Sequence, residues 1–182
     1  YGDEIGMGEN IWLEDRDAVR TPMQWDRSEH MGFSTAAEAD ALTLPLISAP
    51  GWAERNVADS LADPGSFLHA LRDLLAVRRL HPALGRGSFV MRPSSSAAVL
   101  AHTRQDAPEA DGEMLLCLAN VSDEPQEAVV ELDGLAGARS DVVLAGPAGA
   151  REDACVGDDG RLGVTLPPRG YRWLSLSRTK EI

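Results

Sequence analysis

The hydrophobic positions of the chain follow a helical period in one segment. Within Asp63–Leu80, apolar side chains recur three or four residues apart, as on one face of an α-helix: Phe67, Leu68, Leu71, Leu74, Leu75 and Val77. Ser66 is a suitable N-cap, and two arginines lie near the negative end of the helix dipole. The residue before a proline avoids the helical region, so His81-Pro82 predicts the end of this helix, with His81 as a terminator.

After Gly87 the hydrophobic period changes to two, which indicates strands. Turn-forming pairs such as Asp133-Gly134 and Asp159-Gly160 separate the segments, and the second pair predicts a tight hairpin. Several short strands at this spacing predict an antiparallel sandwich or barrel. The predicted strands are Ser88–Arg92, Ala97–Thr103, Glu113–Val121, Gln126–Leu132, Ser140–Leu144, Arg161–Leu166 and Tyr171–Ser177.

Residues 1–56 have no sustained period and predict a long irregular connection. Gly, Pro, Asp and Asn are scattered among aromatic residues here. Disordered segments are poor in aromatics, so an ordered, functional loop is favoured. We expect Trp12, Trp25 and Trp52 to pack beneath this loop, with a place in a ligand site as the alternative.

The composition is that of a soluble globular protein, with 43% hydrophobic and 25% charged residues. A net charge of −12 argues against binding to nucleic acid or to an anionic membrane. No apolar run reaches the roughly 20 residues of a membrane span, and no secretory signal is visible, so we expect a cytoplasmic protein. Cys117 lies in an apolar run and is expected to be a buried thiol; a disulfide with Cys155 stays open. We expect no cofactor and no metal site.

Three motifs near the start of the chain carry a family resemblance. Tyr1–Gly6 reads Tyr-Gly-Asp-Glu-Ile-Gly, Asp15–Trp25 contains Arg-Thr-Pro-Met-Gln-Trp, and Gly32-Phe33-Ser34 follows. Together they resemble the segment that closes the catalytic barrel of trehalose synthases, in the α-amylase family of glycoside hydrolases. The first motif is shared widely in that family, whereas Gly8–Leu13 combined with the second points to trehalose synthases. Ala18 departs from the pattern, where glycine is usual.

The resemblance implies a mixed α+β chain with two parts. Residues 1–86 correspond to the last strand-end, long loop and last helix of a (β/α)8 barrel. Residues 87–182 correspond to a C-terminal antiparallel β-sandwich domain. The later part of the resemblance rests on Arg55–Val57, His81–Gly87, Met114–Asn120 and Gly170–Trp173. The match is poor over Thr35–Ser60, and Glu29–Met31 replaces the usual approach to Gly32.

The resemblance also implies where the chemistry lies. Retaining glycosidases need two carboxyl groups about 5–5.5 Å apart, and the family carries them on barrel strands that precede Tyr1. Asp3 and Glu4 do not replace them, because adjacent side chains on an extended backbone point in opposite directions. We therefore expect no catalytic residue in this chain. It resembles the C-terminal portion of an enzyme whose N-terminal barrel is missing, and it is predicted to be inactive alone.

Two arginines are the candidate substrate-binding residues. In exo-acting members of the family, an arginine of this loop pairs with an upstream carboxylate and binds the non-reducing glucose. Arg20 is our first choice and Arg16 the second, because a planar guanidinium can bond a carboxylate and sugar hydroxyls together. The alternative is a structural ion pair with Asp15 or Asp17.

The implied activity of the complete enzyme is the interconversion of maltose and trehalose by retaining intramolecular glucosyl transfer. Its expected partners are a small sugar and the missing barrel, with a homo-oligomer as a further expectation. An α-glucosidase or α-amylase-type hydrolase is the nearest alternative. Others are a structural domain, or a non-catalytic carbohydrate-binding module using Phe89, Tyr171 or Trp173; we expect the last two to lie in the core.

Overall fold

A computed structural model describes residues 1–10, 12–36, 51–107, 112–146 and 154–177. The chain divides into two compact units, Tyr1–Asp73 and Leu74–Ile182, and each is described by itself. This division falls within helix α2 (Phe67–Leu80), whereas the sequence analysis placed the domain boundary after Arg86. The assignment of residues 1–86 and 87–182 to separate domains stays a prediction.

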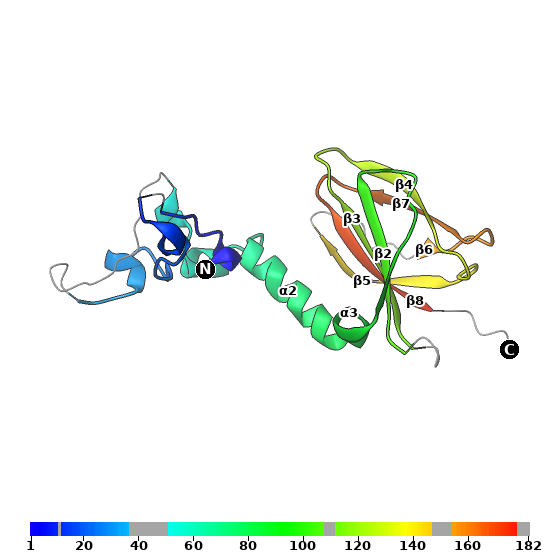
Figure 1. Cartoon of the computed structure of the whole chain (residues 1–182), viewed down its shortest axis with the longest axis horizontal. Helices are drawn as coiled ribbons and strands as arrows, with labels where there is room; N and C mark the ends of the chain where they lie inside the picture. The colour runs from blue at the N-terminus through cyan, green and yellow to red at the C-terminus, as the bar shows by residue number, and fades with distance from the viewer. Residues whose placement is uncertain (11, 37–50, 108–111, 147–153, 178–182) are drawn as a thin grey trace. The chain divides into compact units, whose positions relative to one another are not determined.

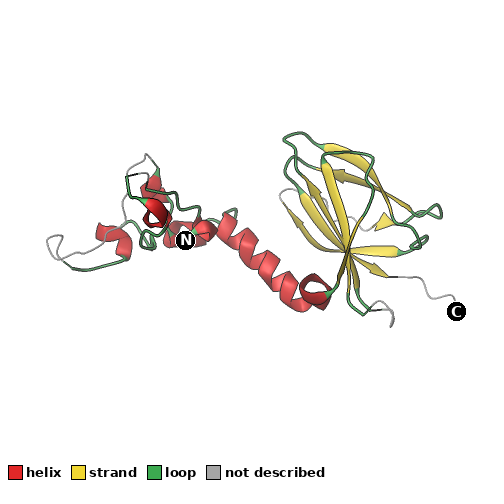
Figure 2. Ribbon diagram, viewed as in Figure 1, coloured by secondary structure: helices red, strands yellow, loops and turns green. Residues whose placement is uncertain are grey.

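The N-terminal unit is built from short helical turns joined by loops (Figure 2), which agrees with the predicted irregular connection. The predicted strand-end at Tyr1–Gly6 is wrong, because a 3-10 turn occupies part of it. A barrel strand requires neighbouring strands for its backbone hydrogen bonds, and the described residues of this unit contain none. The turns are η1 (Asp3–Ile5), η2 (Asp15–Val19), η3 (Glu29–Gly32) and η5 (Trp52–Glu54), followed by helix α1 (Val57–Ala62).

Asn56 is fully buried and starts helix α1. Its side-chain oxygen accepts the backbone N–H of Asp59 at 2.8 Å, while its amide donates to the carbonyl of Ala53 at 2.8 Å and to the Asp59 carboxylate at 2.6 Å. Arg27 donates to the same carboxylate at 2.7 Å. The sequence analysis missed α1, since six residues are too few for a period. The available signal was an N-cap followed three residues later by an acid.

Helix α2 confirms the predicted helix and its cap. The hydroxyl of Ser66 accepts the backbone N–H of His69 at 3.4 Å. No residue of α2 is buried, and Phe67 and Leu80 are among its exposed apolar side chains. The chain then forms helix α3 (Pro82–Arg86), which the sequence analysis missed because it treated Pro82 only as a terminator; a proline also fits the first turn of a new helix.

A side-chain link fastens α3 to the sheet that follows. The Nδ1 atom of His81 lies 2.5 Å from a carboxylate oxygen of Glu113, and the second oxygen accepts the backbone N–H of Ala83 at 3.4 Å. Ala83 is fully buried, and α3 contacts strands β2 and β3. His81 therefore ends α2 and also joins the helical segment to the β region.

The C-terminal unit contains two antiparallel sheets (Figure 1). The larger has the strand order β1-β2-β3-β8-β5-β6, and the smaller pairs β4 with β7. All seven predicted strands are present, the antiparallel pairing is confirmed, and only the two-residue β6 was missed. The strands are β1 (Ser88–Met91), β2 (Val99–Gln105), β3 (Met114–Asn120), β4 (Gln126–Glu131), β5 (Arg139–Gly146), β6 (Ala154–Cys155), β7 (Arg161–Leu166) and β8 (Tyr171–Ser177).

The predicted hairpin at Asp159-Gly160 is wrong, although a turn is present. The backbone N–H of Gly160 bonds to the carbonyl of Gly157 at 2.9 Å. The strands on either side do not pair with each other, because β6 pairs with β5 and β7 pairs with β4. The turn therefore carries the chain from one sheet to the other.

One hydrophobic core is shared by the two sheets. Alternate residues of β7 and β8 are buried, as expected for strands with one face inward. In β8 the inward residues are Arg172, Leu174 and Leu176, so the prediction that Tyr171 and Trp173 lie in the core is wrong. The core residues of the two sheets include Val99, Ala101, Leu116, Leu118, Ala128, Val130, Leu162, Val164, Leu166, Leu174 and Leu176.

Asn120 joins the loop after β3 to the loop before β8. Its amide donates to the carbonyls of Glu124 at 2.7 Å and Pro167 at 2.9 Å, and its oxygen accepts the backbone N–H of Ser122 at 2.9 Å. The side chain is almost completely buried. Its removal leaves several backbone groups without partners.

We predict that Asn120→Ala destabilises the C-terminal unit by about 2–4 kcal/mol, because unsatisfied buried polar groups cost more than the net gain of a hydrogen bond. Urea unfolding followed by circular dichroism in the far ultraviolet, where the strands of this unit contribute, measures this. Val121→Ala, a neighbouring substitution of an exposed side chain, serves as the control and should have little effect. Equal midpoints for both variants would contradict the assigned role.

The two cysteines are free, which resolves the open question of a disulfide. Cys117 is buried and Cys155 is exposed. Burial raises the pKa of the Cys117 thiol to about 11. We predict that one thiol per chain reacts with a chromogenic disulfide reagent at pH 8 and that the second reacts only in denaturant, since thiolates are the reactive species. Cys155→Ser should remove the fast reaction; a fast reaction that persists would contradict this account.

Candidate functional site

The two candidate arginines lie on one short turn of the N-terminal unit. Arg16 belongs to η2 and Arg20 follows it, with the Arg20 backbone N–H bonded to the carbonyl of Asp17 at 3.2 Å. Both side chains are exposed. Within the described residues neither guanidinium forms an ion pair, so the alternative pairing with Asp15 or Asp17 is not seen. Their donors are available to a ligand or to further protein.

Asn10 anchors this turn. Its backbone N–H bonds to the carbonyl of Ala18 at 2.8 Å, and its side-chain oxygen accepts the N–H of Trp12 at 3.1 Å. Asn10 is almost fully buried, and its side-chain amide nitrogen has no partner in the described part of the chain. The buried Asn10 thus bonds the backbone of the turn, while the side chains of Arg16 and Arg20 are exposed to solvent.

The segment after Arg20 is packed inside the N-terminal unit. Thr21, Met23 and Gln24 are buried, whereas Arg20 and Trp25 are exposed. Part of the motif, including the hydroxyl of Thr21 and the amide of Gln24, is therefore packed inside the unit and is not available to a ligand. The motif was found from the resemblance, but which of its side chains point inward was not predictable from the sequence.

A left-handed segment closes the next turn. His30, Met31 and Gly32 have φ values of 54°, 52° and 67°. The carbonyl of Met31 accepts the N–H of Trp25 at 2.8 Å, and Met31 is buried. Non-glycine residues in this conformation carry backbone strain and often mark functional loops. The sequence analysis missed this feature, for which Gly32 was the one local signal.

Asp26 supports the strained segment from inside the same loop. Its carboxylate accepts the backbone N–H of Ser28 at 2.8 Å and also bonds the Ser28 hydroxyl. These bonds, the hydroxyl bond first, hold the pKa of Asp26 below its usual value. A side chain at position 32 would collide with Asp26, since a Cβ there would lie 2.7 Å from the carboxylate. Gly32 is therefore required by both φ and space.

The aromatic residues of the loop face outward. Trp12 is 77% exposed and Trp25 is 49% exposed, so the prediction that they pack beneath the loop is wrong. The side chain of Trp52 lies outside the described residues. Phe33 is also exposed. Exposed aromatic rings fit either stacking on a sugar or packing against further protein.

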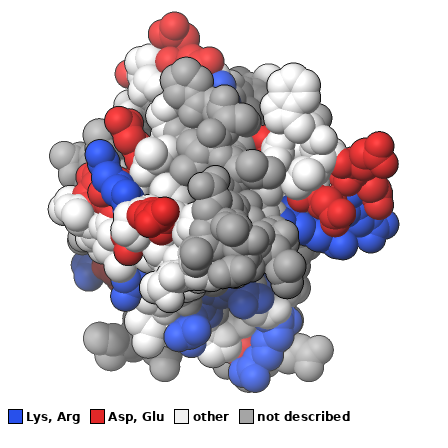
Figure 3. Space-filling model, turned by 90° about the vertical axis from the view of Figure 1, so that its left-hand side faces the viewer, with Lys and Arg blue, Asp and Glu red and all other residues white. Residues whose placement is uncertain are grey.

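The acidic residues of this unit form no evident reaction centre. Asp3 and Glu4 lie in η1, and neither carboxylate bonds another segment within the described residues. No three possible metal ligands gather in the described part of the chain. Figure 3 shows acidic and basic side chains near one another on this side, without one broad basic surface. None of the described helices is long and apolar enough to cross a membrane.

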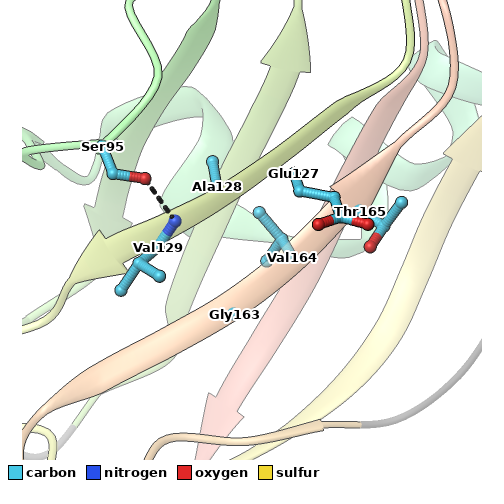
Figure 4. Close-up of a pocket in the computed structure, with 7 residues that line it drawn as sticks. All are labelled: Ser95, Glu127, Ala128, Val129, Gly163, Val164 and Thr165. Carbon is cyan, nitrogen blue, oxygen red and sulfur yellow. Dashed lines mark hydrogen bonds between the residues drawn. The ribbon is translucent and has the colours of Figure 1, made fainter.

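A cavity of about 400 Å³ lies on the smaller sheet of the C-terminal unit (Figure 4). The hydroxyl of Ser95 at its edge accepts the N–H of Val129 at 2.8 Å. Glu127 is its one carboxylate, and it contains no aromatic ring. A retaining glycosidase needs two carboxyl groups, so this cavity does not suit that chemistry. Its lining residues are Ser95, Glu127, Ala128, Val129, Gly163, Val164 and Thr165.

Comparison with known proteins shows which proteins the chain is related to. Residues 1–87 match the family model of the α-amylase catalytic domain. The chain is 45% identical to a trehalose synthase of Pimelobacter sp. over 73% of its length, and 41% identical to the trehalose synthase/amylase TreS of Mycobacterium tuberculosis over its whole length. The chain is related to the trehalose synthases of the α-amylase family. It spans 23% and 29% of the length of these two trehalose synthases.

A solved structure supports the same relationship. The trehalulose synthase MutB of Pseudomonas mesoacidophila matches 92% of this chain with a TM-score of 0.67 and 30% identity, over 27% of its own length. That enzyme has also been solved, as a mutant, in complex with its substrate sucrose. Glucan 1,6-α-glucosidases are relatives at lower identity than the trehalose synthases. The relatives of the chain that are named here are thus enzymes that transfer or hydrolyse glucosyl groups.

The role of Arg20 and Arg16 stays a prediction that a hybrid enzyme can test. We define the hybrid as the Mycobacterium tuberculosis trehalose synthase/amylase with its matching region replaced by this chain. We predict that Arg20→Ala lowers kcat/KM for trehalose formation about 100-fold or more, because a lost charge-assisted pair costs several kcal/mol.

Arg20→Lys should recover little activity, since lysine lacks the planar fork. Arg16→Ala is the matched comparison. It should lower kcat/KM less than about tenfold, because Arg20 and not Arg16 is expected to form the pair with the carboxylate. Circular dichroism and melting curves check that each variant folds. An Arg20→Ala hybrid with unchanged kcat/KM would remove Arg20 from the substrate site.

Proposed function

We propose that this chain forms the C-terminal part of an enzyme that interconverts maltose and trehalose. The observation that carries the proposal is the anchored turn that presents Arg16 and Arg20, which form no ion pair with the described residues, within the motifs of the trehalose synthases. Identity of 41% over the whole chain to a trehalose synthase/amylase supports it. Residues 1–86 would supply the last loop and helix of a (β/α)8 barrel, and residues 87–182 a C-terminal β-sandwich.

Two observations support the two-part organisation. The match to the catalytic-domain family model stops at residue 87, and strand β1 starts at Ser88. The two sheets beyond it share one hydrophobic core, as two packed sheets of a sandwich do.

The proposed chemistry assigns positioning to this chain and bond cleavage to residues outside it. In a retaining transfer, a carboxylate of the enzyme displaces the reducing glucose of maltose and holds the other glucosyl group covalently. The freed glucose turns in the pocket, and its anomeric hydroxyl displaces the carboxylate to give trehalose. Active sites of such barrels lie among the loops at the C-terminal ends of the strands, where residues 1–56 belong in this proposal.

Arg20 would bind the non-reducing glucose, with Arg16 beside it. The loop would also help to exclude water, because water that reaches the glucosyl intermediate converts transfer into hydrolysis. The exposed rings of Trp12 and Trp25 suit this second task, since they offer apolar area at the rim of a pocket.

Exposed apolar residues support the view that more protein covers this chain. They lie in the loop and in helix α2, and exposed apolar surface often marks a site of contact with other protein. They include Tyr1, Trp12, Trp25, Phe33, Leu61, Phe67, Leu75 and Leu80. These residues would meet the body of the barrel in the complete enzyme.

Two other functions have a specific observation in their favour. A hydrolase of α-glucosides is favoured by the relationship to glucan 1,6-α-glucosidases. A carbohydrate-binding module is favoured by the exposed ring of Phe89, although Tyr171 and Trp173 are half-buried. A pull-down on starch tests the module, whose prediction is clear retention of the isolated chain. The cytoplasmic location and the homo-oligomer of the complete enzyme stay predictions.

The decisive experiment compares the isolated chain with the hybrid enzyme. Each is incubated with maltose, and trehalose and free glucose are quantified. We predict no conversion by the isolated chain, because the proposal places the paired carboxylates outside it, and trehalose as the main product of the hybrid.

The unmodified Mycobacterium tuberculosis relative serves as the positive control. Glucose in large excess over trehalose from the hybrid would favour the hydrolase. Trehalose formation by the isolated 182-residue chain would overturn the proposed division of labour.

A further inference from the structure

The middle of strand β7 carries a glycine that the fold does not require. Gly163 is exposed, and its φ lies outside the left-handed region. The register of β7 with β4 runs through it without a shift, so it marks no bulge. A Cβ atom added at this position would meet no described atom within 4 Å. A glycine inside a strand lowers its stability and often marks a place where a ligand or another backbone approaches closely.

The missing side chain leaves space on the outer face of the smaller sheet. Alternate residues of β4 and β7 are buried in the core, so Gly163 and the Val129 opposite it face outward. The Ser95 hydroxyl accepts the N–H of Val129 at 2.8 Å, and the Ser95 N–H donates to the Val129 carbonyl at 2.9 Å. Val129 and Gly163 are therefore a non-hydrogen-bonded pair, in which the two strands lie close together. This pair lines the cavity of about 400 Å³ in Figure 4, which we call the Gly163 hollow.

Hydrogen-bonding side chains surround an apolar floor in the Gly163 hollow. Val129 is 41% exposed and forms the floor together with the bare backbone of Gly163. Glu127 and Thr165 lie opposite each other in the register at one end, and Ser95 lies at the other (Figure 4). Within the described residues, the Glu127 carboxylate and the Thr165 hydroxyl have no bonding partner, and the Ser95 hydroxyl keeps its proton for a further bond. These groups are available to a ligand.

A second cavity, of about 310 Å³, adjoins the Gly163 hollow and shares Ser95 and Val129 with it. It adds Glu131 and Arg161, whose side chains are 3.7 Å apart in an exposed ion pair. Exposed pairs of this kind are weak, so either partner can bond a ligand instead. The volume of each cavity lies within the roughly 300–1,000 Å³ that is usual for small-molecule sites.

An added peptide strand is a poor occupant of this region. The outer edge of β7 carries no strand in the described part of the chain, and such edges can pair with another chain. However, the carbonyl of Thr165 already accepts a bond from the Arg172 guanidinium at 3.2 Å. The N–H of Arg161 donates to the Asp159 carboxylate at 3.1 Å. Both ends of the edge are therefore occupied, and the free stretch around Gly163 is too short for a strand ladder.

Ions and a second copy of this chain are also poor occupants. The carboxylates of Glu127 and Glu131 outnumber the guanidinium of Arg161 along the two cavities, which disfavours an anion. No three possible metal ligands gather among the described residues. Self-association would bring the same carboxylates together, between chains that each carry a net charge of −12. A neutral ligand rich in hydroxyl groups matches what remains.

We propose that the Gly163 hollow and the adjoining cavity form a non-catalytic binding site for a short α-glucan chain. One glucose ring lays its C–H face on Val129 and Gly163, and its hydroxyls bond Glu127 and Thr165. The next ring reaches Arg161 in the second cavity. The site goes beyond the proposed function, although the choice of α-glucan among sugars rests on it. Because no aromatic ring lines either cavity, we expect a Kd on the order of 1 mM.

NMR titration of the isotope-labelled 182-residue chain with maltotetraose tests the site. We expect the amide signals of β4 and β7, including those of Val129, Gly163 and Thr165, to shift with a Kd on the order of 1 mM. The amide of Phe89 should not shift, although its exposed ring is the alternative sugar contact on this unit. The absence of shifts in β4 and β7 at about tenfold the expected Kd would overturn the proposal.

Two substitutions within the Gly163 hollow sharpen the test. Gly163→Leu should raise the Kd at least about tenfold, because the new side chain fills the space meant for the sugar ring. Its melting temperature should not fall, since a Cβ there meets no described atom and glycine is a weak strand former. Thr165→Val keeps a β-branched strand residue and removes only the hydroxyl, so it should raise the Kd about threefold or more.

Glu127→Gln and Glu124→Gln are a matched pair, because both residues are exposed and only Glu127 lines the hollow. Glu127→Gln should raise the Kd about threefold or more, since a carboxylate accepts stronger bonds from sugar hydroxyls than an amide does. Glu124→Gln should leave it unchanged. Equal effects of the two, or an unchanged Kd in Gly163→Leu, refute the site. Loss of binding in Phe89→Ala would assign the sugar contact to Phe89 and would refute it as well.

The outcome is separable from the proposed function. A hybrid that hydrolyses maltose without making trehalose, while the 182-residue chain binds maltotetraose through β4 and β7, refutes the proposed activity and leaves the glucan site intact. A hybrid that makes trehalose, while the chain gives no shifts in β4 and β7, refutes the glucan site alone.

Discussion

The structure of the C-terminal unit depends on a six-stranded antiparallel sheet that has apolar side chains on both faces. The smaller sheet covers one face and forms the core with it. Helix α3 covers part of the other, where the link between His81 and Glu113 holds it in place. The remainder of this face, on β1 and β2, leaves Phe89, Met91 and Leu100 exposed.

The N-terminal unit is held together in a different way. Its fixed points are buried side-chain amides such as those of Asn10 and Asn56, which bond backbone groups of irregular segments. Irregular backbone cannot satisfy its own hydrogen-bonding groups, so side-chain amides take the place of a strand ladder. The result presents arginines and tryptophans outward. That arrangement suits a loop at the rim of a substrate pocket better than it suits an independent domain.

Much of the secondary structure was predictable from the sequence, for reasons that also explain the errors. Helix α2 and seven strands have enough residues for a period to be visible, whereas α1, α3 and β6 are too short. The period also does not reveal which face of β8 is inward: both faces are apolar, and Trp173 was assigned to the wrong one. Asp159-Gly160 predicted a turn correctly, but the strands that a turn joins are decided by packing far along the chain.

The candidate site was found through motifs and not through local physics. The motifs identified Arg16 and Arg20, while the 3-10 turn that carries them and the left-handed path through His30 and Met31 were not predictable. Such conformations are set by contacts with the surrounding structure, among them the buried Met31. The exposure of Trp12 and Trp25 was missed for the related reason that the sequence of an irregular loop has no period to show which side chains face inward.

The central claim is that this chain positions substrate while residues outside it break and form the glycosidic bond. Trapping the covalent intermediate in the hybrid enzyme, with a fluorinated glucosyl fluoride and peptide mapping by mass spectrometry, tests this most directly. The account predicts that the glucosyl adduct lies on a carboxylate of the part contributed by the relative. An adduct on any aspartate or glutamate within residues 1–182 would contradict it.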